Sequence, residues 1–145
     1  MRLTKNRQRR RFERGYSLLE LLVVLAILGL IIAIAAPRLI GYFEASKAKT
    51  AKIQISNLAT AMDLYYLSNG GYPAEEQGLK ALVEKPDGVP GWDGPYLNRA
   101  EGIIDPWGRP YLYKQPGVHG KFDISSLGAD GKESGTGEDA DLGSW

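Results

Sequence analysis

The C-terminal stretch of this chain, residues 127–141, concentrates side chains that could bind a metal. Within fifteen residues it holds five carboxylates and four glycines. Hard cations such as Ca²⁺ take about six to eight oxygen ligands, and a glycine-rich loop can turn backbone carbonyls as well as carboxylates toward one ion. The spacing does not follow the EF-hand pattern, and acidic loops are also typical of solvated surface turns. The residues alone leave both interpretations open.

A second unusual group is Glu20, an ionisable residue at the start of a long apolar segment. No charged or strongly polar side chain occurs from Leu21 to Ala36. A helix over residues 18–36 would be roughly 28 Å long, close to the hydrocarbon thickness of a bilayer. An unpaired carboxylate at that depth costs about 2–3 kcal/mol, so Glu20 indicates a partner or a function. Stabilisation by the helix macrodipole is the simpler alternative.

Catalytic chemistry finds little support in the sequence. The chain has one histidine, His119, in a turn bounded by glycines, and it has no cysteine. No serine can be matched to a base and an acid. We therefore expect a protein that is not an enzyme.

Charge is distributed unevenly along the 145 residues, although the net charge is only +1. Residues 1–14 hold seven of the 18 Lys and Arg side chains and one of the 17 Asp and Glu side chains, so the remainder carries −5. A basic flank before an apolar helix stays cytoplasmic and sends the following chain outward. A basic arm for nucleic acid is the alternative, but the apolar helix explains the charge more simply, so we expect no nucleic-acid partner.

The helical pattern continues beyond the apolar segment. Small or apolar residues recur at spacings of three and four, at Ala48, Ala51, Ile55, Leu58, Met62 and Tyr65. This stripe predicts an amphipathic helix that packs on a sheet and ends at Asn69, before two glycines. Pro37 lies inside the long helix, where a kink or a melted turn is expected because proline removes a hydrogen bond.

The remaining residues, 70–145, are predicted to form a small globular domain. A short helix is expected within residues 75–84, and residues 105–108 (Asp-Pro-Trp-Gly) fit a type I turn. Residues 111–113 and 122–124 flank a Gly- and Pro-containing turn, which predicts an antiparallel hairpin. The three tryptophans are expected to pack within this domain.

The N-terminal residues resemble the prepilin processing site of type IV pilins and type II secretion pseudopilins. The match combines a basic leader, Gly15, an aromatic Tyr16, Glu20 and the apolar helix. It implies cleavage between Gly15 and Tyr16 by a prepilin peptidase, which also methylates the new amine of Tyr16. It implies further that Glu20 meets the amine of a neighbouring subunit during assembly. Ordinary signal-peptidase cleavage near Ala36, which would release an exported calcium-binding domain, is a remote alternative.

The same resemblance implies the layout of the chain. Residues 1–15 would be a cytoplasmic leader peptide. An α+β fold of the type IV pilin-like, lollipop kind would follow, with a long N-terminal helix over residues 16–69 whose transmembrane part covers about residues 18–37. This helix, half membrane segment and half amphipathic, would pack on a small antiparallel sheet in a periplasmic domain over residues 70–145, which ends in a metal-binding loop.

Motifs farther along the chain narrow the resemblance to the major pseudopilins of the type II secretion system, the general secretion pathway protein G family. These motifs are Tyr72-Pro73, Gly94-Pro95-Tyr96-Leu97, Asp105-Pro106-Trp107-Gly108 and Gly128-Ala129-Asp130-Gly131. Together with the N-terminal site they extend over nearly the whole chain from Gly15. A type IV pilin is the nearer alternative, but such pilins usually close the C-terminal loop with a disulfide, and this chain has no cysteine.

In that family the C-terminal loop binds a structural Ca²⁺. Carried over, the ligands would be Asp130, Asp139 or Asp141, and backbone carbonyls of Leu127 and of the turn at Thr136. Glu138 is a further candidate, because the loop length varies in the family.

The resemblance finally implies a structural role. The chain would be a single-pass protein of the bacterial inner membrane, with its N-terminus cytoplasmic, that polymerises into a periplasmic pseudopilus and drives export of folded proteins through the outer membrane. Its implied partners are other copies of itself, the prepilin peptidase and methyltransferase, minor pseudopilins, and an inner-membrane assembly platform with its ATPase. Membrane lipid would surround the helix before assembly.

Overall fold

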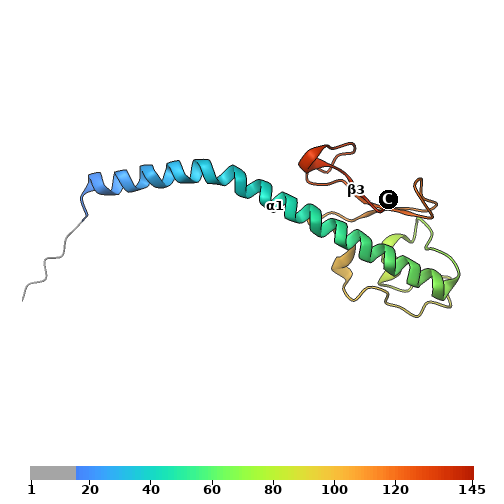
Figure 1. Cartoon of the computed structure of the whole chain (residues 1–145). Helices are drawn as coiled ribbons and strands as arrows, with labels where there is room; N and C mark the ends of the chain where they lie inside the picture. Colours follow the sequence, from blue (N-terminus) through green and yellow to red (C-terminus); the bar gives the residue numbers. More distant parts are fainter. Residues whose placement is uncertain (1–15) are drawn as a thin grey trace, which may run out of the picture. The chain divides into compact units, whose positions relative to one another are not determined.

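The computed structural model describes residues 16–145, which are drawn in colour in Figure 1. The chain forms two compact units divided between Arg38 and Leu39. One helix, α1 (Leu18–Asn69), begins in the first unit and ends in the second. Its assignment is continuous through Pro37, so the turn there is not melted, and the kink at Pro37 stays a prediction. Gly15 and the rest of the leader lie outside the described residues, as does the side chain of Glu138.

In the first unit, α1 is long and apolar enough to cross a membrane. Its large hydrophobic side chains are exposed along the whole segment, with Leu25 at 58% and Ile32 at 63%. Apolar side chains exposed on every side of a helix require lipid or another protein as their surroundings. The exposed apolar side chains of the first unit are therefore expected to contact lipid or another protein molecule.

In the second unit, α1 buries one face against the rest of the chain. Its buried residues are Ala51, Ile55, Leu58, Ala61, Met62 and Tyr65. The spacing of three and four that predicted an amphipathic helix is confirmed, with Ala48 partly buried at the edge. The helix ends at Asn69 because Gly70 takes a left-handed conformation (φ +74) and its N–H donates to the Tyr66 carbonyl at 2.8 Å.

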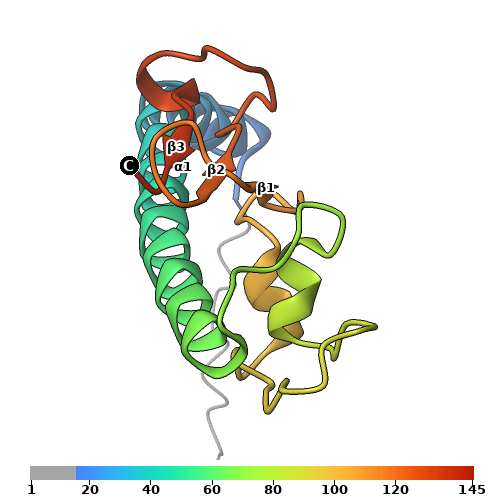
Figure 2. The ribbon, with the colours of Figure 1, turned by 90° about the vertical axis from the view of Figure 1, so that its right-hand side faces the viewer.

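A three-stranded antiparallel sheet lies beside this half of α1 (Figure 2). Its strands are β1 (Leu112–Lys114), β2 (Asp123–Ser126) and β3 (Leu142–Gly143), in the order β1-β2-β3. Tyr113 pairs with Ile124 and Ser126 with Leu142. Ile124 is fully buried and joins the helix residues in one core, so the predicted packing of a long helix on a small sheet is confirmed.

Short 3₁₀ helices and turns fill the rest of the second unit. They are η1 (Gly78–Leu82), η2 (Ala100–Ile103) and η3 (Gly137–Asp139). The helix expected within residues 75–84 is thus a shorter 3₁₀ turn, whose Leu79 and Leu82 are buried. The predicted type I turn is present, since the Gly108 N–H donates to the Asp105 carbonyl at 2.9 Å.

Candidate functional site

The first turn of α1 is fixed by a side-chain cap. The Ser17 hydroxyl oxygen accepts the backbone N–H of Glu20 at 3.1 Å, and the Ser17 carbonyl accepts the N–H of Leu21 at 3.1 Å. Ser17 is therefore the N-cap, and Glu20 is the third residue of the helix. A Ser followed three residues later by Glu is the capping-box pattern. This function of Ser17 could have been read from the sequence and was missed.

Tyr16 and Glu20 stand at the exposed end of this helix. Tyr16 has 85% of its surface exposed, and Glu20 is also exposed. Among the described residues no side chain bonds to the Glu20 carboxylate. Because Glu20 is exposed, its carboxylate is accessible to another molecule.

The acidic loop, residues 127–141, is folded back on itself. The Asp141 carboxylate accepts the backbone N–H of Ser134 at 2.8 Å, and the Asp130 carboxylate accepts that of Lys132 at 3.0 Å. Ser134 takes a left-handed conformation (φ 67), which makes the reversal possible. Within the described part of the chain, no three acidic or histidine side chains come together as a metal-binding group. Asp130, Asp139 and Asp141 are each exposed.

The backbone of this loop, however, is packed closely on itself at two glycines. A Cβ on Gly128 would lie 2.7 Å from the carbonyl oxygen of Ala140, and one on Gly135 would overlap the carbonyl oxygen of Asp139. Only glycine fits at these two close approaches. Carbonyl oxygens and two or three carboxylates are the donor set of a hard cation, so the residues present suit Ca²⁺.

A buried ionic group joins the acidic loop to the sheet and to the turn at residues 105–108. Asp105 is 4% exposed; it accepts the Ser126 hydroxyl at 2.7 Å and the backbone N–H of Arg109 at 2.8 Å. The Arg109 guanidinium lies 3.7 Å from the Asp105 carboxylate and donates to the carbonyl of Gly128. These contacts hold the first residues of the loop, next to Gly128, against the sheet and the turn.

The same turn also contacts α1. The Trp107 indole N–H donates to the Glu44 carboxylate at 2.6 Å, and Lys47 donates to its other oxygen at 3.1 Å. The hydrogen bond from Trp107, followed by that from Lys47, lowers the pKa of Glu44. Glu44 is therefore ionised and attached to the globular unit at neutral pH.

The chain terminus packs against the hairpin turn. The Asp123 carboxylate, 8% exposed, accepts the backbone N–H of Val118 at 2.7 Å and lies 3.0 Å from Nδ1 of His119. Burial acts to raise the pKa of Asp123, but these hydrogen bonds outweigh it and the pKa is lowered. Trp145 stacks on His119 at 3.9 Å yet keeps 62% of its surface exposed. Trp145 therefore packs on the surface of the hairpin turn, whereas Trp92 and Trp107 pack against the core.

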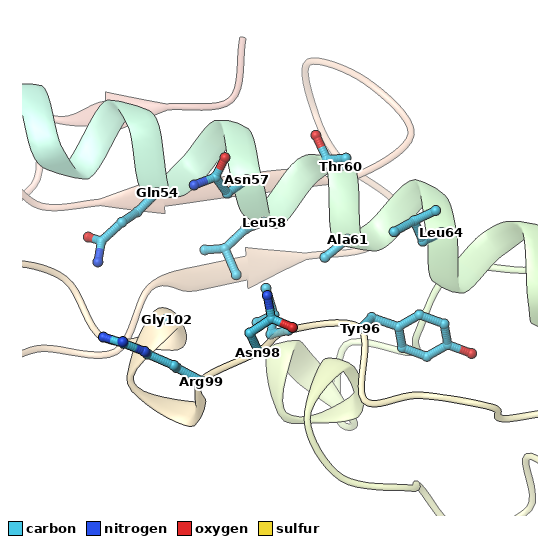
Figure 3. A pocket seen from close by; sticks show the side chains of 11 residues that line it. Gln54, Asn57, Leu58, Thr60, Ala61, Leu64, Tyr96, Asn98, Arg99 and Gly102 are labelled. Atoms are coloured by element: carbon cyan, nitrogen blue, oxygen red, sulfur yellow. The ribbon is translucent and has the colours of Figure 1, made fainter.

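A groove of about 440 Å³ runs between α1 and the segment over residues 96–102 (Figure 3). Its walls carry amide and aliphatic side chains of α1, such as Gln54, Asn57 and Leu64, and the guanidinium of Arg99 on the opposite side. This lining offers no paired nucleophile and base. It is a shallow surface feature rather than a catalytic pocket.

Two family models match consecutive parts of the chain. The family model described as type II secretion system (T2SS), protein G matches residues 38–145, and that described as prokaryotic N-terminal methylation motif matches residues 10–36. The type II secretion system core protein G of Pseudomonas aeruginosa is 46% identical over 141 residues, with 94% of this chain and 97% of that protein covered. That of Aeromonas hydrophila is 44% identical, with 95% of each covered.

A solved structure agrees with these relatives. The crystal structure of the major pseudopilin from the type 2 secretion system of enterohaemorrhagic Escherichia coli is 37% identical, with a TM-score of 0.61 over 74% of this chain and 89% of that one. These matches decide between the pseudopilin and type IV pilin alternatives, and they describe a structural subunit rather than an enzyme. The chain belongs to the protein G family of the type II secretion system, the family of its major pseudopilins.

Proposed function

We propose that this chain is the subunit that builds the pseudopilus of a type II secretion system. The observation that carries the proposal is the apolar part of α1 in the first unit, whose large side chains are exposed. The methylation-motif match covers this part of the helix, in a chain of the protein G family. Such a helix is stable in lipid as a single subunit and in a filament core when copies pack together. The growing filament then drives folded proteins through the outer membrane.

The processing step follows from the same motif. Prepilin peptidase would cut between Gly15 and Tyr16 and methylate the new amine, which leaves Tyr16 as the first residue. The amine of one subunit and the Glu20 carboxylate of its neighbour would pair, since opposite charges in an apolar environment attract far more strongly than in water. The exposure of Glu20 in the first turn of α1 supports this role, because it leaves the carboxylate accessible to a neighbouring subunit.

Membrane insertion sets the topology that we propose. The basic residues 1–14 stay in the cytoplasm, α1 crosses the inner membrane and the second unit folds in the periplasm. Assembly would then involve other copies of the chain, minor pseudopilins, and a membrane platform with its ATPase that extracts subunits from lipid.

Purified filaments test the proposal. Wild-type chain, expressed with prepilin peptidase and the assembly machinery, should give filaments whose subunits begin at methylated Tyr16 by mass spectrometry. The Glu20→Ala variant should be cut and inserted normally but should form few filaments. A mature chain that starts near Ala36, or normal filaments from Glu20→Ala, would contradict the proposal.

We also propose that the acidic loop holds a structural Ca²⁺. Asp130 with Asp139 or Asp141 would supply carboxylate oxygens, and Leu127 and Thr136 would supply backbone carbonyls. Support comes from the close approach of the two arms of the loop at Gly128 and Gly135 and from the hydrogen bond that joins Asp141 to Ser134 across the loop. A bound ion would hold the loop closed and so keep β3 in the sheet, which the chain reaches only through this loop.

A further inference from the structure

The apolar surface of α1 does not end at Pro37. Four large hydrophobic side chains follow within six residues, and they are Leu39 (55% exposed), Ile40 (62%), Tyr42 (75%) and Phe43 (68%). At about 100° per residue they cover roughly half of the helix circumference. None of them belongs to the core of the second unit. Arg38 begins this stretch and is exposed as well.

We propose that residues 38–43, here called the interfacial segment, lie in the headgroup region of the periplasmic leaflet while the subunit waits in the membrane. This inference rests on the membrane-anchored form proposed above. Its partner is the lipid surface, because the segment continues the apolar membrane helix without a break in α1. Its composition also fits that layer, since aromatic rings settle at the membrane–water interface and a long arginine side chain reaches the phosphates.

The length of the helix supports this position. From Leu18 to Phe43, α1 has a contour length of roughly 39 Å at 1.5 Å per residue. A bilayer is about 30 Å thick in its hydrocarbon core and about 40–45 Å thick with both interfacial layers. The helix up to Ala36 is about as long as the core is thick, whereas the helix up to Phe43 is nearly as long as the whole bilayer is thick.

A fixed polar boundary follows the interfacial segment directly. The carboxylate of Glu44 is held by Trp107 at 2.6 Å and by Lys47 at 3.1 Å, so it is tied to the globular unit and cannot follow Phe43 into hydrocarbon. The lowered pKa of Glu44, due first to the bond from Trp107, keeps it charged. The step from Phe43 to Glu44 therefore marks the water side of the interface.

Single-cysteine labelling tests the inference, because the chain has no cysteine of its own. Full-length chains with Leu28→Cys, Ile40→Cys or Ile53→Cys are labelled with a polarity-sensitive fluorophore and placed in phosphatidylethanolamine and phosphatidylglycerol vesicles. Some vesicles carry a nitroxide quencher on the lipid headgroup. We expect the label at residue 40 to be quenched several-fold more than the label at residue 53, and the label at residue 28 to report an apolar environment.

Serine substitutions then test the role of the aromatic pair. Tyr42→Ser with Phe43→Ser should reduce quenching of the label at residue 40. The matched pair Ile53→Ser with Leu67→Ser, on exposed positions of the same helix beyond Glu44, should leave it unchanged.

The label at residue 28 separates two kinds of failure. If it reports water, the proposed membrane anchoring fails. If it reports an apolar environment while the label at residue 40 behaves like that at residue 53, the interfacial segment is wrong. A label at residue 40 that is shielded from water but not quenched by lipid nitroxide would also overturn the inference, because a second copy of the chain would then cover the segment.

Discussion

Removal of the proposed calcium ion should destabilise the second unit by an amount that its geometry allows us to work out. Without the ion we expect the part of the loop after Gly131 to open and β3 to lose its place beside β2. That change exposes Leu142, which is 7% exposed in the fold and whose burial is worth about 2 kcal/mol. It also breaks the hydrogen bonds that join Ser144 and Ile124, each 3.0 Å long and each worth about 1 kcal/mol.

The sum, about 4 kcal/mol, is an upper estimate because the freed loop regains conformational entropy. Linkage gives a similar figure, since a hundredfold excess of ion over its dissociation constant adds about 2.7 kcal/mol. At about 4–8 °C per kcal/mol for a domain near this size, chelation should lower the melting temperature by about 10 °C or more.

Thermal unfolding of residues 39–145 in excess Ca²⁺ and in excess chelator measures this difference. The Asp130→Ala variant is the matched control, and its melting temperature should be low in both conditions. Glu133→Ala, a substitution in the same loop at a position without a proposed ligand, should behave like the wild type. An identical melting curve for the wild type in calcium and in chelator would refute the calcium assignment.

Three further predictions concern the fold around the site. Leu58→Ala should cost about 2–5 kcal/mol in chemical unfolding, because Leu58 is 1% exposed in the core between α1 and the sheet. Asp123→Asn should lower the melting temperature at neutral pH. The difference from the wild type should disappear in acid, because the stability that comes from the lowered pKa of Asp123 is lost as the pH falls through that pKa. A deficit that persists in acid would refute that role. Ser17→Ala should remove about 1 kcal/mol from the first turn of α1, seen as faster amide exchange at Glu20 in micelles, whereas unchanged exchange would contradict the cap.

The long helix was predictable because its signals are local and repeated. The apolar run, the stripe from Ala51 to Tyr65 and the glycines after Asn69 each follow from periodicity and backbone preference, and the structure confirms them. The hairpin of β1 and β2 was predictable for the same reason. The third strand was not, because Leu142–Gly143 has only two residues and pairs through the fold rather than through a pattern of its own.

The contacts around the candidate sites depend on residues far apart in the chain. Trp107 meets Glu44 across 63 positions, and Arg109 reaches Gly128 across 19, so no spacing rule could find either pair. The assembly residue Glu20 and the loop carboxylates were identified as candidates from their type and from family resemblance. Their proposed partners, the amine of a neighbouring subunit and a metal ion, are not part of this chain, so neither its sequence nor its structure contains them.

Export in living cells tests the central proposal most directly. Deleting the gene should stop release of folded proteins through the outer membrane while twitching motility, which depends on type IV pili, continues. Wild-type gene supplied in trans should restore export, and the Glu20→Ala gene, expressed and cut to the same extent, should not. Normal export in the deletion strain, or loss of twitching with export intact, would contradict a role as the pseudopilus subunit.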